Sequence, residues 1–160
     1  MSGDSKIFSD LRLAGEATDI EALLAGIPYA RHLGMEVERQ GRELTFIMRF
    51  APHLIGNPRL PALHGGVIGS FLETAAILGL IWDAPLQQLP KPVDIGIDFL
   101  RSGKPVDTFA RAIISKRGRR VANVRAEAWQ EEQGRPIASL HGHFLIMPDA
   151  QIPSPLVGEG

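Results

Sequence analysis

One short stretch of the sequence combines residue types that could act on a carbonyl group. His64, Gly65 and Gly66 stand directly before an apolar run, and Glu73 is the only ionisable residue inside that run. If the run is a helix, the backbone N–H of Gly65 lies at its start, without a partner in the helix and at the positive end of the helix dipole. Such an amide can polarise a carbonyl oxygen, and a carboxylate can act as a general base or as a nucleophile.

The apolar run predicts one helix of about five turns, from residue 65 to residue 82. It contains no proline, and its large apolar side chains fall on nearly every face. The run is about long enough to cross a bilayer, but Glu73 stands at its middle, so we interpret it as a core helix and expect no membrane contact. Such a helix must be enclosed, and covering it with a curved sheet and a second subunit predicts a homodimer.

Burying Glu73 without a partner would be costly, so its position needs a reason. One interpretation is a functional carboxylate; the other is a side chain that reaches a rim or caps a neighbouring turn. Ser70 and Thr74 lie within a turn of Glu73 and are weaker candidates for substrate binding, because helical hydroxyls more often bond to the helix backbone.

The segments around the helix predict an antiparallel sheet. Strand-forming residues separated by turn residues occupy residues 35–39, 44–50, 93–100, 108–116, 121–130 and 137–147. No helix stands between the last four strands, which disfavours a parallel sheet. Residues 51–63 contain three prolines and predict a long ordered loop without a strand. The prediction is an α+β fold in which five to six antiparallel strands wrap around one long central helix.

Three regions are expected along the chain. Residues 1–32 are expected to form an N-terminal extension with short helices, one of them starting at Thr18 and Asp19. Residues 33–147 are expected to form the α+β domain itself. Residues 148–160 predict a C-terminal tail. The N-terminus has charges of both signs and no apolar run of signal-peptide length, so a cytoplasmic protein is expected.

The composition excludes several classes of function. A net charge of −1 gives no global field that would attract nucleic acid, and the absence of cysteine excludes thiolate nucleophiles and sulfur-based zinc sites. His141 and His143 share one face of the last strand, but no third ligand is evident, so neither a metal nor a cofactor is predicted.

Taken together, these motifs resemble the PaaI-like acyl-CoA thioesterases of the hotdog superfamily. The resemblance is carried by Asn57, the proline-rich loop, His64–Gly66 and an acidic residue nine positions after the histidine, and it covers about residues 34–147. It includes the strand at residues 93–101 and the segment at residues 134–138, although many family members have Asp where this chain has Glu73.

The resemblance implies hydrolysis of an acyl- or aryl-CoA thioester to a free acid and CoA. In that reaction Gly65 would polarise the carbonyl, Glu73 would be base or nucleophile, Asn57 would orient substrate or water, and Gly66 would line the site. His64 could touch the thioester or orient the loop, and the alternative is a helix-start histidine held by packing. Gly65 and Glu73 are eight residues apart, about 12 Å along one helix. Two antiparallel helices across a twofold axis would bring Gly65 of one chain to Glu73 of the other, and the dimers could pair into a tetramer.

The phosphates of CoA need cationic partners. Arg117, Arg119 and Arg120 cluster on a predicted hairpin and could bind them, a solvated turn is the alternative, and Arg101 and Lys104 are comparable candidates. Two other functions stay open at this point, a hotdog acyl-thioester dehydratase and a non-catalytic acyl-CoA or lipid-binding protein.

Overall fold

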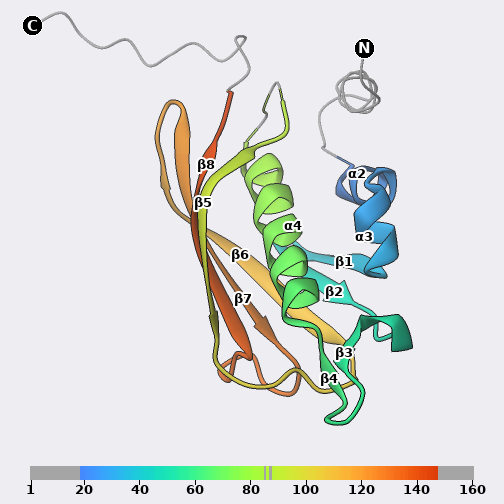
Figure 1. Cartoon of the computed structure of the whole chain (residues 1–160). Helices are drawn as coiled ribbons and strands as arrows, with labels where there is room; N and C mark the ends of the chain where they lie inside the picture. Colours follow the sequence, from blue (N-terminus) through green and yellow to red (C-terminus); the bar gives the residue numbers. More distant parts are fainter. Residues whose placement is uncertain (1–18, 85, 87, 148–160) are drawn as a thin grey trace, which may run out of the picture.

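A six-stranded antiparallel sheet curves around one long helix, α4 (Gly65–Asp83), as Figure 1 shows. The computed structural model describes residues 19–84, 86 and 88–147. The other elements are α2 (Ile20–Gly26), α3 (Pro28–His32), β1 (Met35–Gln40), β2 (Glu43–Met48), the 3-10 turn η1 (Pro52–Leu54), β3 (Ile55–Asn57), β4 (Ala62–Leu63), β5 (Lys91–Phe99), β6 (Thr108–Arg117), β7 (Val121–Trp129) and β8 (Ala138–Leu145). The predicted α+β architecture is confirmed.

The strand order in the main sheet is β1-β2-β6-β7-β8-β5. Every neighbouring pair is antiparallel, as the turn residues predict. Gly41 forms the predicted β1–β2 turn with φ +61°, a left-handed conformation that suits glycine. Because β5 is the last strand in this order, it is an edge strand, and only its side toward β8 is paired within the described chain.

Helix α4 lies close against the inner face of the sheet because the side chains between them are small. Four alanines of β6 and β7 are at most 1% exposed: Ala110, Ala122, Ala126 and Ala128. A Cβ atom at Gly79 would come within 2.8 Å of the Cβ of Ala112, so the two backbones approach almost as closely as they can. Phe71 and Leu72 of α4 are fully buried in the same core. This close packing gives the helix a fixed position relative to the strands.

One stripe of α4 is not covered by the rest of the chain. Val67, Ser70, Glu73, Thr74 and Ile77 recur at helical spacing, and each is half-buried. By length and composition α4 is apolar enough to cross a membrane, with a mean hydropathy of 1.6, yet half of this apolar stretch is buried inside the fold. The expected enclosure of α4 is thus only partial within one chain.

Two short helices precede the sheet. Asp19 caps α2, since its side chain accepts a hydrogen bond from the N–H of Ala22 at 3.0 Å, which confirms the predicted helix start. Residues 1–18 of the predicted N-terminal extension and the predicted tail at residues 148–160 lie outside the described residues.

The proline-rich segment before α4 corrects one expectation. Residues 51–63 are not a loop without strands, because β3 and β4 pair there as a short separate hairpin. Asn57 stabilises its turn, accepting hydrogen bonds at its Oδ1 from the N–H groups of Arg59 at 3.1 Å and Leu60 at 3.4 Å. The hairpin leads directly into α4 and so holds the start of the helix.

Strands β2 and β6 pair along only part of their length. Residues 46–48 pair with residues 108–110, and beyond that point the strands separate. Asp107 closes the paired end: its carboxylate accepts the Phe50 N–H at 2.7 Å and the Arg49 guanidinium at 2.9 Å. The Phe50 amide and then Arg49 hold the pKa of the Asp107 carboxyl below its usual value. The other end of this strand pair is left open.

Candidate active site

The start of α4 leaves one backbone amide without a partner. His64 is the N-cap, and its Nδ1 accepts a hydrogen bond from the Gly66 N–H at 2.9 Å. The carbonyl oxygen of His64 accepts from the N–H groups of Val67 at 3.0 Å and Ile68 at 3.2 Å. Among the described residues nothing accepts a hydrogen bond from the Gly65 N–H. Of the amides in this first turn, Gly65 therefore has the one that a ligand can use.

The cap also determines which tautomer a neutral His64 ring adopts. A ring nitrogen that accepts a hydrogen bond carries no proton, so in neutral His64 the proton is on Nε2. His64 is exposed. Its Nε2–H is thus a second donor at the same end of the helix.

The helix start is held from two sides. The His64 N–H donates to Leu54 O at 2.9 Å, and the Leu63 N–H donates to Gly103 O at 2.9 Å. At Gly56 a Cβ atom would come within 2.7 Å of the His64 Cα, so only glycine fits there without displacing the cap. These contacts explain how the chain keeps the Gly65 amide in place.

Glu73 lies on the uncovered stripe of α4, and it is the only ionisable residue between Gly65 and Trp82. Its carboxylate accepts no hydrogen bond from another described residue. Next to it, Ser70 Oγ donates to Gly66 O at 2.7 Å and Thr74 Oγ1 donates to Ser70 O at 2.8 Å. Both hydroxyl protons are thus used by the helix backbone, whereas the hydroxyl oxygens can still accept. Within one chain, Glu73 and the Gly65 amide are about two turns apart and do not meet.

The structure does not bring Asn57 to the helix through a hydrogen bond. The Asn57 side chain is exposed on β3, and its Oδ1 is used by the hairpin turn. Only its amide NH₂ is left for other partners.

The three predicted phosphate ligands differ in their surroundings. Arg117 is half-buried and donates to Asp83 at 2.9 Å and to Leu80 O at 3.5 Å, so it closes the C-terminal end of α4. Arg119 and Arg120 are exposed in the β6–β7 turn. In Figure 1 this turn lies toward the end of α4 that is opposite to Gly65.

The alternative phosphate ligands are already bonded. Arg101 donates to Pro136 O at 2.6 Å, and Lys104 pairs with Glu131 at 2.7 Å. The Lys104 ammonium lowers the pKa of the Glu131 carboxyl.

The two histidines of β8 lie on the sheet surface away from α4. His143 Nδ1 is 2.9 Å from Asp94 Oδ1, and His141 Nδ1 is 3.9 Å from Asp98 Oδ2. Within the described part of the chain, no group of three or more His, Asp or Glu side chains is arranged to hold a metal ion.

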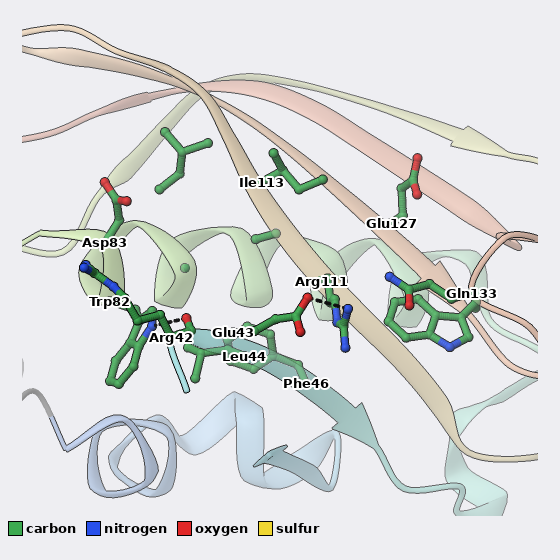
Figure 2. Close-up of a pocket in the computed structure, with 14 residues that line it drawn as sticks. Arg42, Glu43, Leu44, Phe46, Trp82, Asp83, Arg111, Ile113, Glu127 and Gln133 are labelled. Carbon is green, nitrogen blue, oxygen red and sulfur yellow. Dashed lines mark hydrogen bonds and ion pairs between the residues drawn. The ribbon is translucent and has the colours of Figure 1, made fainter. Parts of the chain in front are cut away.

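A cavity of about 500 Å³ lies where β2 and β6 separate. Figure 2 shows Trp82 reaching Arg42 across its mouth, where the indole N–H donates to the Arg42 carbonyl at 2.8 Å. Arg111 and Glu43 form an ion pair of 2.6 Å over the same opening. None of the predicted site residues lines this cavity. The α4 residues that line the cavity, such as Gly79, come from the C-terminal half of the helix and not from its start.

One neighbour of the helix start was not anticipated from the sequence. The ring of Phe99, at the end of β5, lies beside Gly65, with Cζ and Cε1 at 3.4 and 3.5 Å from the position of a Cβ atom there. Alternation along the strand indicates which face Phe99 occupies, but not which part of the helix it meets.

Known proteins with similar sequences and folds identify the family of this chain. Residues 60–137 match the family model described as the thioesterase superfamily. The chain is 32% identical over 150 residues to the medium/long-chain acyl-CoA thioesterase YigI of Escherichia coli, covering 85% of this chain and 93% of that protein.

Two solved structures show the same fold. A protein from Chromobacterium violaceum is 36% identical, with a TM-score of 0.69 over 91% of this chain and 99% of that one. The PaaI protein of the Escherichia coli phenylacetic acid degradation operon is 18% identical, with a TM-score of 0.68 over 91% and 96% of the two chains. The expected hotdog fold is confirmed and is shared with the PaaI protein. By its sequence similarity the chain belongs to the thioesterase superfamily as a thioester hydrolase.

Proposed function

We propose that this protein hydrolyses acyl-CoA thioesters to a free acid and CoA, using the Gly65 amide and the Glu73 carboxylate. The observation that carries the proposal is the start of α4, where every other amide of the first turn is bonded and that of Gly65 is not. The similarity to YigI supports acyl-CoA as the substrate class.

The chemistry follows from the two groups. The thioester carbonyl oxygen accepts the Gly65 N–H, and the positive end of the helix dipole stabilises the negative charge that develops on that oxygen. Glu73 then takes a proton from water as the water oxygen bonds to the carbonyl carbon, or its own oxygen attacks that carbon and water later cleaves the anhydride. In both routes the C–S bond breaks, and CoA leaves as a thiol after gaining a proton.

The site is intermolecular in this proposal. Gly65 and Glu73 are about 12 Å apart along α4, too far to act on one carbonyl. A second copy with its α4 antiparallel to the first would place the partner's Glu73 near Gly65 and would cover Val67 and Ile77 of the uncovered stripe. A twofold dimer then holds two equivalent sites, and two dimers could form a tetramer.

The remaining predicted residues have supporting roles. His64 positions the Gly65 amide through its cap and can donate its Nε2–H toward the thioester, and the NH₂ of Asn57 can orient substrate or water. Gly66, Ser70 and Thr74 line the approach between them. The protein is expected to act in the cytoplasm.

Among the basic residues, the exposed Arg119 and Arg120 are the best ligands for the CoA phosphates. Arg117 is committed to the end of α4, and Arg101 and Lys104 are bonded elsewhere.

Subunit complementation tests both the two residues and their placement. Gly65→Pro removes the amide proton but suits the first position of a helix, and His64 already has the extended backbone (φ −62°, ψ 132°) that precedes proline. Glu73→Gln removes the carboxylate at constant size. Each variant alone should lose about 100-fold or more in kcat on acyl-CoA while sedimenting as a dimer.

Mixing the two inactive variants distinguishes the arrangements. After unfolding and refolding together, half of the dimers combine one chain of each kind, and each such dimer has one intact intermolecular site. About a quarter of wild-type activity should return. No recovery would contradict the intermolecular site, and full activity of Glu73→Gln would remove Glu73 from the chemistry. Binding of acyl-CoA without any turnover by the wild type would indicate a non-catalytic acyl-CoA-binding protein.

A further inference from the structure

Phe99 is an unusually exposed aromatic ring. It is 57% exposed, whereas Phe46, Phe71 and Phe144 are at most 1% exposed. Phe99 is the last of the β5 side chains that face α4, and Ile97, another of them, packs against Gly69. The packing of this chain alone does not account for a ring left so far in water.

The ring lies next to the unpaired amide. Its Cζ is 3.4 Å from the position of a Cβ atom on Gly65, which is ordinary van der Waals distance. A carbonyl oxygen bound to the Gly65 N–H would be about 2.9 Å from that nitrogen. The ring is therefore close enough for one of the two substituents on that carbonyl carbon to reach it.

The backbone next to the ring is also held in place. The N–H groups of Leu100 and Arg101, directly after Phe99, donate to Ile137 O at 2.8 and 3.0 Å. The loop that follows is bonded to the segment before the helix, through the Leu63 N–H and Gly103 O at 2.9 Å. The end of β5 and the start of α4 are therefore tied together, and backbone contacts fix the position of the Phe99 backbone relative to that of Gly65.

We propose that Phe99 is a specificity-determining residue whose ring forms one wall of the acyl pocket, beside the Gly65 amide; the inference rests on the function proposed above. The chemistry of the substrate selects the acyl side of the thioester. The pantetheine arm carries amides that need hydrogen-bond partners, and a phenyl ring offers none. An aliphatic or aryl group gains from covering the ring, because both apolar surfaces leave water.

This placement predicts a dependence on the length of the acyl chain. An acetyl group is too short to cover the ring, whereas a longer chain lies across it. Phe99→Ala should lower kcat/KM on octanoyl-CoA and lauroyl-CoA roughly tenfold or more, and on acetyl-CoA by less than about threefold. Phe99→Leu, which keeps an apolar wall, should retain most of the activity on the longer substrates.

The experiment measures kcat/KM for these three acyl-CoAs on both variants, and binding of S-dodecyl-CoA and S-ethyl-CoA thioethers by calorimetry. Ile113→Ala is the matched control, because Ile113 is 60% exposed on β6, three places from β5 in the sheet. It should change neither chain-length preference nor binding. Circular dichroism confirms folding, and little change is expected because so much of the Phe99 ring is outside the core.

The outcomes separate this inference from the proposed function. If the wild type hydrolyses acyl-CoA and Phe99→Ala affects every chain length equally, or none, the acyl wall is overturned and the hydrolysis stands. If the wild type binds S-dodecyl-CoA in preference to S-ethyl-CoA without hydrolysing acyl-CoA, and Phe99→Ala removes that preference, the wall stands and the hydrolysis falls. If the wild type neither hydrolyses nor binds, both are overturned.

Discussion

The free backbone groups at the two ends of α4 are treated differently by the rest of the chain. At the C-terminal end, Leu80 O accepts the Ala84 N–H at 3.4 Å and an N–H of Arg117 at 3.5 Å, while Asp83 pairs with the same guanidinium at 2.9 Å. At the N-terminal end, the amide of Gly65 has no partner among the described residues. The chain thus neutralises the negative end of the helix with its own cation and leaves a donor free at the positive end.

This difference indicates that the C-terminal end of α4 contributes to stability and its N-terminal end to function. Anions bind readily at helix N-termini, because backbone N–H groups and the dipole act together there. A change at the C-terminal end should therefore affect folding, and a change at the Gly65 amide should affect chemistry. Three sets of variants test that division.

The largest effect is expected at Gly65 itself. Gly65→Ala keeps the N–H and adds a methyl group that meets the Phe99 ring at ordinary contact distance, so the protein should fold with nearly unchanged stability. Gly65→Pro also removes the donor and should cost about 100-fold or more in kcat. Steady-state kinetics with thermal unfolding would show a larger loss for proline than for alanine. Equal losses would mean that space at Gly65, and not its amide, is what matters.

A smaller effect is expected from the cap. His64→Ala removes the acceptor for the Gly66 N–H and should lower the free energy of unfolding by about 1 kcal/mol. Because the cap also positions the Gly65 amide, kcat should fall too. His64→Asn supplies another good N-cap and should restore both quantities in denaturation and activity measurements. Restored stability with low kcat would place the His64 Nε2–H at the thioester instead.

The smallest effects concern the basic hairpin. Arg117→Ala should lower the free energy of unfolding by about 1 kcal/mol, since it removes a cation from the end of α4, and should leave KM nearly unchanged. Arg119→Ala and Arg120→Ala should do the reverse, raising KM for acyl-CoA a few-fold at low salt with unchanged stability. Denaturation curves and KM at two salt concentrations provide the comparison. A rise in KM for Arg117→Ala as large as that for Arg119→Ala would indicate that Arg117 binds the CoA phosphates after all.

Much of the fold was predictable because its signals are local. The proline-free apolar run predicted α4 to within one residue of its observed end at Asp83, and glycine or proline punctuation separated the strands. The start of β5 was less clear, since Pro92 argues against a strand. Proline is tolerated there because β5 is an edge strand with an irregularity between Pro92 and Asp94. Which strand is at the edge depends on the whole sheet.

The candidate site was predictable in its residue types but not in its contacts. His64–Gly66 and Glu73 stand out in the sequence, yet the direction of the His64 ring decides that Gly65 and not Gly66 has the free amide. Arg117 looks like its basic neighbours until the fold brings it to Asp83, 34 residues away in sequence. Phe99 reaches Gly65 only through tertiary packing. The contacts of Arg117 with Asp83 and of Phe99 with Gly65 join segments that no local pattern connects.

The partial pairing of β2 with β6 also bears on how the protein moves. Among the described residues, strand pairing joins the β1–β2 hairpin to the other four strands only at residues 46–48 and 108–110, with the side chain of Arg111 bonded to Glu43 and Thr45 beyond it. By contrast, β6, β7 and β8 pair along most of their length. In terms of native-state hydrogen exchange, the sheet should then behave as two cooperative units. Amides of the β1–β2 hairpin should exchange through local openings that leave β6–β8 and the start of α4 intact. The hairpin side of the sheet can then open while the Gly65 amide keeps its position.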